Sequence, residues 1–225
     1  MVTLTTHNVG GMSVELEGRS IGGGGCKLQH IRQSARLHNP DFMVLTETHV
    51  QIENLANDKI IPKKYIVLQS DTSGAPSAGV LILGKKNGHK PIEGSVRNSG
   101  LGRFTLAVYL INGSRVIIGG VYGESDPSDS RSNRIMMRLA AILSELSTLY
   151  STSTVLLAGD FNANLKANQS SSQRLRKPRT TDTILSIMDR YDMIDTGDKA
   201  RILNRNRGQG NGEIEDPPPH LETFQ

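Results

Sequence analysis

The sequence predicts a single α/β domain whose sheets are buried beneath helices. Short β-branched and apolar runs alternate with segments of helical periodicity along the 225 residues, an order that puts helices on the faces of sheets. Phe104–Leu110 and Val116–Tyr122 flank Asn112-Gly113, which is a strong signal for a two-residue β-hairpin. The sequence contains neither an internal repeat nor a long linker, so we expect one domain over 1–225.

The remaining strands are expected wherever a short apolar or β-branched run ends in a turn or a polar residue. The runs that meet this description are Val2–Thr6, Phe42–Leu45, Tyr65–Leu68, Gly79–Leu83 and Thr154–Ala158.

Three helices are expected from 3.6-residue periodicity. Lys27–His38 places Leu28, Ile31 and Ala35 on one face, and Asn39-Pro40 ends it. Gly22–Gly25, just before it, is expected to be a loop because four glycines carry a large backbone entropy. The strongest helical pattern is the stripe formed by Ile135, Leu139, Ile142, Leu146 and Leu149. A third helix is expected to begin at Thr183–Met188.

Composition excludes several classes of protein. No apolar run is long enough to span a bilayer, and Met1–Gly10 lacks the basic-then-apolar pattern of a signal peptide. Cys26 is the single cysteine, so an internal disulfide is impossible. We therefore expect an intracellular protein that does not associate with membranes.

Positive charge is concentrated in one part of the chain. Residues 166–207 hold ten basic and five acidic side chains, and because the whole chain carries +4, the remainder is near −1. Arg174, Arg176, Lys177 and Arg179 are the densest group and are candidates for binding a nucleic-acid backbone. A solvated loop would explain the same charges, and composition does not decide between the two.

Polar side chains stand at or just after the ends of the predicted strands. They are Asn8, Glu47, Tyr122, Asp160 and Asn162. Taken singly, an Asn near a turn caps it and a Glu after a strand is solvated. Together they predict an oxygen-rich cleft at one rim of the sheets, where α/β proteins place their sites. Such a cleft suits Mg²⁺, with Mn²⁺ as a substitute, whereas the Cys/His spacing of a zinc site is missing from the set.

Six short blocks, in order along the chain, resemble the endonuclease/exonuclease/phosphatase family, which has the DNase I-like fold. Gly159-Asp160-Phe161-Asn162 is similar to its GDFN signature and Thr46-Glu47-Thr48-His49 to its (Q/T)ETH block. The other four blocks are Asn8-Val9-Gly10-Gly11, Ser77-Ala78-Gly79-Val80, Gly102-Arg103-Phe104 and Val121-Tyr122-Gly123. The resemblance implies a four-layer α/β sandwich.

Within the family, the chain most resembles the endonuclease domain of LINE-type (non-LTR) retrotransposons. The segments that carry this likeness are Asn8–Gly11, Asp192–Asp195 and Glu222–Phe224. The likeness implies a metal-dependent, DNA-nicking endonuclease that acts in the nucleus in target-primed reverse transcription. It also implies DNA as a partner and a reverse transcriptase fused to, or encoded with, this domain.

The resemblance also assigns roles to individual residues. Glu47 and Asn8 would hold Mg²⁺, and Asp160 would orient or deprotonate the attacking water. Asn162 and Tyr122 would contact the scissile phosphate, and Thr223 would line the same cleft. Relatives continue past the position of Thr223 into an S-x-I-D-Y strand and a Ser-Asp-His block, so we expect 1–225 to be a C-terminally incomplete domain.

Two other functions stay open from sequence. An abasic-site nuclease or a phosphomonoesterase would keep the same fold and site. A non-catalytic nucleic-acid-binding remnant would instead account for the missing Ser-Asp-His block. The basic stretch at 166–207 favours a polymeric substrate over a small one.

Overall fold

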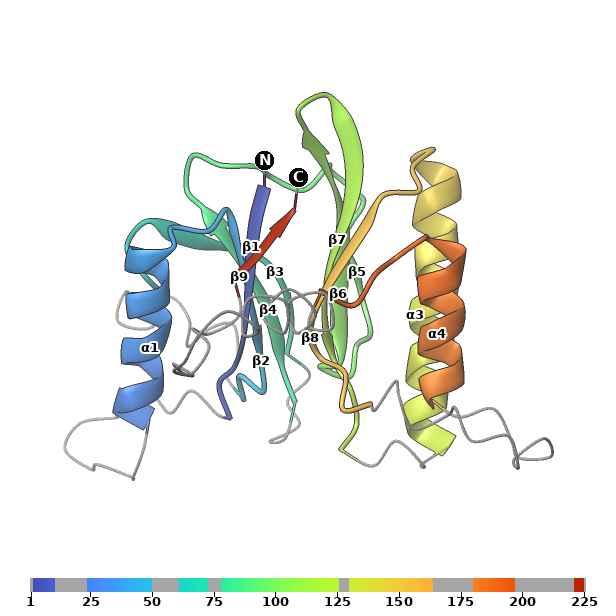
Figure 1. The fold of residues 1–225 in the computed structure, drawn as a ribbon, viewed down its shortest axis with the longest axis horizontal. Helices are drawn as coiled ribbons and strands as arrows, with labels where there is room; N and C mark the ends of the chain where they lie inside the picture. The colour runs from blue at the N-terminus through green and yellow to red at the C-terminus, as the bar shows by residue number, and fades with distance from the viewer. Residues whose placement is uncertain are drawn as a thin grey trace, which may run out of the picture.

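The chain folds into two β-sheets packed face to face, with helices covering both outer faces (Figure 1). The computed structural model describes residues 2–10, 24–49, 61–72, 78–125, 130–163, 180–196 and 221–224. The layers run helix, sheet, sheet, helix, from α1 on one side to α3 and α4 on the other (Figure 1). The predicted four-layer α/β sandwich is therefore confirmed.

The first sheet, sheet A, has the strand order β3-β4-β2-β1-β9. β1 and β2 are parallel, with Leu4 opposite Phe42 and Asn8 opposite Thr46, whereas β9 runs antiparallel to β1. The strands are β1 (Val2–Asn8), β2 (Phe42–Thr46), β3 (Tyr65–Asp71), β4 (Val80–Lys85) and β9 (Leu221–Phe224). Because β1 and β2 are parallel, Asn8 and the residue after Thr46 emerge at the same rim.

The second sheet, sheet B, has the strand order β5-β6-β7-β8. Its strands are β5 (Arg97–Asn98), β6 (Phe104–Ile111), β7 (Ser114–Tyr122) and β8 (Val155–Asp160). The predicted hairpin joins β6 to β7, and Asn112 and Gly113 both have positive φ, at 49° and 81°, as a type I′ turn requires. β7 and β8 are parallel, so Tyr122 and Asp160 end side by side.

Alternation along the strands builds three apolar layers. On β6, Leu106 and Val108 pack against α3 (Ser130–Leu149) and α4 (Thr180–Arg190), whereas Ala107 and Tyr109 face sheet A. On the far side, Ile31 of α1 (Gly24–Leu37) packs against the outer face of sheet A. Each sheet therefore buries both faces, which explains why the strands read as nearly continuous apolar runs.

One hydrogen-bonded carboxylate fixes where β1, β2 and β4 lie relative to one another. Asp41 accepts hydrogen bonds from the Thr3 amide (2.9 Å) and hydroxyl (3.1 Å), and it pairs with Lys85 Nζ at 2.9 Å. Burial alone would raise the pKa of Asp41, but these donors outweigh it and the pKa is lowered. Asp41 thus sets the register in which the ends of β1 and β2 meet at the opposite rim.

The structure corrects two details of the expected helices. Gly24 and Gly25 belong to the first turn of α1 rather than to a loop. The amides of a first helical turn have no partner within the helix, so glycine costs less there than in a helix interior. In α3 the predicted Ile135, Leu139 and Leu146 are buried and are joined by Met136 and Leu143, whereas Leu149 is 61% exposed at the helix end. Among the described residues, no helix has the length and apolar character needed to cross a membrane.

Candidate active site

Three side chains from the ends of three strands meet at one rim of the sandwich. Asn8 Nδ2 donates to Glu47 Oε1 at 2.9 Å and to Asp160 Oδ2 at 3.0 Å. Asn8 ends β1 and Asp160 ends β8, while Glu47 follows β2 directly. The site therefore joins the two sheets, and it brings together residues 152 positions apart in the chain.

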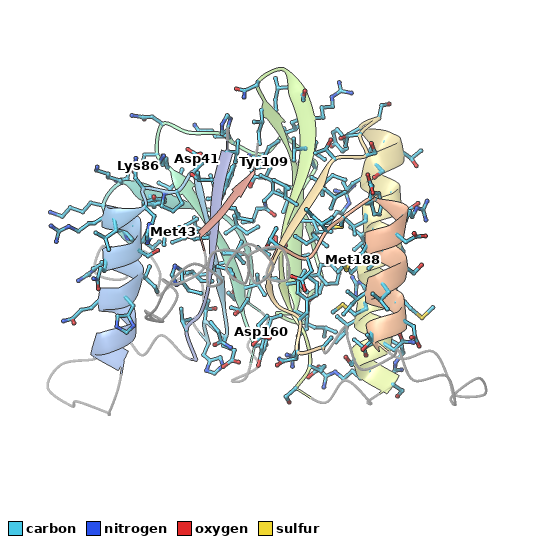
Figure 2. All side chains as sticks on the ribbon, in the orientation of Figure 1. Asp41, Met43, Lys86, Tyr109, Asp160 and Met188 are labelled. Atoms are coloured by element: carbon cyan, nitrogen blue, oxygen red, sulfur yellow. The ribbon has the colours of Figure 1, made fainter. Side chains whose placement is uncertain are left out.

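The rim lies at the end of the sandwich where both parallel strand pairs finish. Figure 2 shows Asp160 at this end and Asp41 at the opposite end of the sheets. Tyr122, opposite Asp160 in the β7–β8 pair, is buried with 8% of its surface exposed. Four of the five predicted residues thus come from strand ends that point the same way.

Asn8 links two carboxylates through a single NH₂ group. Its Oδ1 atom accepts the Gly10 amide at 3.0 Å, so the amide oxygen is turned away from Glu47 and Asp160. Two carboxylates that share one donor are placed where a cation would be attracted to both. Rotation of the amide by half a turn would direct Oδ1 to the same point and give three oxygen donors.

This donor set fits a hard divalent cation. Carboxylate and amide oxygens are the ligands of Mg²⁺, which takes one or two carboxylates and keeps several waters. Within the described ranges, no group of three or more His, Cys, Asp and Glu side chains is close enough to hold a metal ion. With two carboxylates and one amide as donors, a cation bound at the rim would keep coordination positions for water and phosphate.

Glu47 is held in a strained backbone conformation. Its φ is 55°, in the left-handed region that residues other than Gly, Asn and Asp seldom adopt. The amides of Thr48 and His49 donate to the carbonyls of Gly79 and Ala78, both at 3.2 Å. These bonds to the two residues just before β4 hold Glu47 in place, and strain of this kind is common at functional sites.

Asp160 and Asn162 form a local turn at the end of β8. The Asn162 amide donates to Asp160 Oδ1 at 3.0 Å, and Asn162 itself has φ at 48°. Asn162 Nδ2 donates to the Gly123 carbonyl at 3.0 Å, while the Gly123 amide donates to the Asp160 carbonyl at 2.7 Å. Gly123 approaches so closely that a Cβ there would lie 2.0 Å from the Phe161 carbonyl oxygen. The turn after β7 and the turn after β8 are therefore locked together.

Tyr122 connects the carboxylate pair to a buried arginine. Burial raises the pKa of the Tyr122 phenol, and its hydrogen bond to the Glu47 carboxylate raises it further. The Arg103 guanidinium stands over the Tyr122 ring, 4.9 Å from its centroid, and lowers the pKa by a smaller amount. The phenol thus stays protonated and donates to Glu47.

Sequence reasoning missed the roles of Arg103 and Glu124. Arg103 is 5% exposed and pairs with Glu124 at 2.8 Å, and Glu124 also lies 3.2 Å from Arg131 Nε. Arg103 belongs to the Gly102-Arg103-Phe104 block, which marked a strand but gave no sign of a charge beside Tyr122. Its neighbours come from the end of β7 and the start of α3, so only the tertiary fold reveals the contact.

The side chains of the predicted substrate-binding residues lie outside the described part of the structure. Arg174, Arg176, Lys177 and Arg179 lie outside the described residues. Thr223 is opposite Thr3 in the β1–β9 pair, and its side chain is outside the described part of the structure. His7, next to Asn8, faces the other way: its ring bonds Ser34 Oγ of α1 at 3.1 Å, and burial, with His38 and His30 nearby, lowers its pKa.

The arrangement of sheets and helices is a known fold. Two packed sheets between helices match the DNase I-like fold of solved structures of the endonuclease/exonuclease/phosphatase family. No protein-family model and no curated protein matches the chain by sequence. The assignment of fold therefore rests on structural similarity.

Three solved structures illustrate the similarity. The AP endonuclease LMAP from Leishmania major is 15% identical and superimposes with a TM-score of 0.57 over 84% of this chain and 66% of its own. A mannosyl-6-phosphatase from Bacteroides thetaiotaomicron is 14% identical and superimposes with a TM-score of 0.56 over 83% of this chain and 70% of its own. TDP2 of D. rerio, solved with a single-stranded DNA product, is 16% identical and superimposes with a TM-score of 0.51 over 72% of this chain and 61% of its own.

These values establish a shared fold and no more. The chain spans less than two thirds of the D. rerio TDP2 structure. The names of the three proteins indicate different substrates. One is an AP endonuclease, one is a sugar phosphatase, and the third was crystallised with DNA.

Proposed function

We propose that this protein is a Mg²⁺-dependent phosphodiesterase that nicks DNA, with Asn8, Glu47 and Asp160 at its active centre. The observation that carries the proposal is the convergence of two carboxylates on the Asn8 amide at the rim where β1, β2 and β8 end. A phosphodiester carries a negative charge, so a rim of two carboxylates would repel it unless a cation were bound between them.

In this proposal Glu47 and Asn8 would hold the cation, which would neutralise charge on the phosphate when bound. Asp160 would accept a proton from the attacking water through Oδ2, which is freed when the Asn8 amide turns its oxygen to the cation, while Oδ1 keeps the Asn162 amide. Tyr122, kept protonated, would donate from beside Glu47 to a phosphate oxygen. Asn162 Nδ2 donates to the Gly123 carbonyl, so Asn162 would need to rotate to reach a substrate.

The proposal of a retrotransposon endonuclease is narrower and rests on sequence. Asn8–Gly11, Asp192–Asp195 and Glu222–Phe224 resemble segments of LINE-type endonucleases. Such an enzyme would act beside a reverse transcriptase, which uses the nick as a primer. A primer requires a free 3′-hydroxyl, so this proposal predicts that a polymerase can extend the nicked strand without prior end repair.

Conversion of supercoiled plasmid to the open circle in Mg²⁺ tests the general proposal. Because the chain spans 61–70% of the structures that it resembles, the assay is run on this chain and on a longer product of the same reading frame. We expect nicking that EDTA abolishes and that Glu47→Ala and Asp160→Ala each reduce by at least a hundredfold. The proposal would be contradicted if nicking persisted in either variant, or if neither wild-type protein, the chain nor its longer product, nicked the plasmid.

A panel of substrates tests the competing activities. The similarity to an AP endonuclease and to a sugar phosphatase makes an abasic duplex and a sugar phosphate the informative comparisons. Intact plasmid cleaved at a rate close to that of the abasic duplex would favour the general DNA endonuclease. Cleavage confined to the abasic duplex or the sugar phosphate would assign one of the other two activities. Salt-sensitive DNA binding without cleavage would favour a non-catalytic remnant.

A further inference from the structure

A cluster of lysines lies at the end of sheet A opposite the active rim. Lys63 and Lys64 precede β3, and Lys86 and Lys90 follow β4; all four are exposed, and we call them the basic pole. Figure 2 shows Lys86 at this end and Asp160 at the other. β2, with five residues, separates the two ends, and at about 3.3 Å per residue it sets them roughly 16 Å apart.

The fold itself brings these lysines together. β3 and β4 are antiparallel, with Tyr65 opposite Lys85, so the turn before β3 meets the turn after β4. The Lys86 amide donates to the Lys64 carbonyl at 2.9 Å, and His89 stacks on Phe42 with ring centroids 6.1 Å apart. Two segments more than twenty residues apart in sequence are therefore fixed side by side.

Carboxylates do not neutralise the basic pole within the described structure. Residues 61–70 and 82–92 contain five lysines and neither Asp nor Glu. Of those five, Lys85 alone has a carboxylate within ion-pair distance among the described residues, namely Asp41. Like charges held together without counter-charges repel one another, and a bound polyanion would relieve that repulsion.

The composition of the pole fits a phosphate backbone better than a protein or a membrane. The connection Lys86–Lys90 consists of Lys, Asn, Gly and His, with no apolar side chain to insert into a bilayer. Protein interfaces are depleted in lysine and need an apolar centre. Ile61, in the turn before β3, packs against the core of sheet A instead of forming such a centre. Lysines that contact phosphates supply affinity without reading sequence.

We propose that the basic pole is a second, sequence-independent nucleic-acid-binding surface, separate from the active rim. It would hold a strand or duplex segment that the rim does not cleave. The net charge of the chain outside 166–207 is near −1. The basic pole is a positive region within that part of the chain, and acidic side chains at other positions cancel its charge in the total.

Binding without hydrolysis tests this inference independently of catalysis. Fluorescence anisotropy of a labelled oligonucleotide is measured in EDTA, across about 50 to 200 mM salt. The test variant is Lys64→Gln/Lys86→Gln. The matched control is Arg134→Gln/Arg138→Gln, which removes two exposed charges from α3 on the other side of the molecule.

The two double variants lower the net charge of the protein by the same amount. A difference in DNA binding between them therefore reports a local contact and not the change in total charge. We expect the pole double to reduce the slope of log K against log salt by about 1.4 to 1.8 and the control to leave it nearly unchanged. Equal losses in the two variants would overturn the proposal. It would also be overturned if the pole double lost binding to phosphatidylserine vesicles but kept its affinity for the oligonucleotide.

Discussion

Tyr122 stands between a carboxylate and a guanidinium, and this position determines what its hydroxyl can do. The phenol donates to Glu47, and Arg103 lies over its ring and is itself paired with Glu124. Burial and the neighbouring carboxylate both raise the pKa of Tyr122, so the group is a proton donor at any ordinary pH. A nucleophilic or basic role for this tyrosine is therefore disfavoured.

Tyr122→Phe isolates this donor. A hydrogen bond to a charged group contributes about 1.5–3 kcal/mol, so we expect nicking to fall by roughly ten- to a hundredfold if the bond is transferred to the phosphate in the transition state. Nicking rate and thermal midpoint are measured together, with Tyr150→Phe, a partly exposed site on α3's C-terminal side, as the control. An unchanged rate in Tyr122→Phe would exclude the phenol from the reaction.

At the scale of single elements, the sequence predicted strands and helices better than it predicted the contacts between them. The Asn112-Gly113 hairpin followed from local backbone chemistry, and its turn has the positive φ values expected. The α3 stripe followed from periodicity at Ile135, Leu139 and Leu146, and Met136 and Leu143 widen it because both sheet B and α4 pack on this helix. The bonds between Thr48–His49 and Ala78–Gly79 join separate segments and leave no local signal.

Gly79→Ala tests whether those bonds position Glu47. A Cβ at Gly79 would lie 2.3 Å from Thr48 Oγ1, next to Glu47, and its φ of 134° suits glycine alone. We expect a destabilisation of about 1–3 kcal/mol together with a loss of nicking of up to about a hundredfold, since a shift of about 1 Å can cost that much. Denaturant unfolding and nicking rates measure the two effects.

Gly94→Ala is the matched control for that change. Gly94 also has a positive φ, at 75°, but nothing lies within 4 Å of a Cβ built there. Its variant should lose some stability through backbone strain and keep its activity. If Gly79→Ala behaved in the same way, the contact with Thr48 would not be what positions Glu47.

For the whole molecule, buried tyrosines predict how stability changes in alkali. Burial, with a smaller effect of Asp41, raises the pKa of Tyr65 to about 12, and its hydroxyl donates to the Pro40 carbonyl at 2.7 Å. The folded state therefore keeps this proton above pH 10, where the unfolded chain releases it. Stability from this group is complete below pH 10 and is lost as the pH rises towards 12.

Urea unfolding at a series of pH values from about 8 to 11.5 measures this loss. The wild-type free energy of unfolding should fall above about pH 10. Tyr65→Phe should be less stable at pH 8, because the Pro40 carbonyl loses its donor, and should show a shallower decline above pH 10. An equally steep decline in the variant would show that other groups govern alkaline unfolding.

Across the molecule, the site was predictable to the extent that parallel strands define a common rim. Asn8, Glu47 and Asp160 could be named because each ends or follows an apolar strand. That one Asn8 amide would bridge both carboxylates, and that Arg103 would stand behind Tyr122, depended on how the two sheets pack. The basic pole escaped notice because its lysines come from two separate turns.

The central claim is that Glu47 and Asn8 hold a divalent cation beside Asp160, and cation binding tests it more directly than catalysis. Calorimetric titration with Mn²⁺ is made on the wild type, on Glu47→Gln and on Glu93→Gln, an exposed glutamate between β4 and β5. Loss of a supporting group at a metal site costs about ten- to a hundredfold in affinity, so loss of a ligand should cost at least about tenfold. We predict that loss in Glu47→Gln and unchanged affinity in Glu93→Gln; equal affinity in all three proteins would contradict the claim.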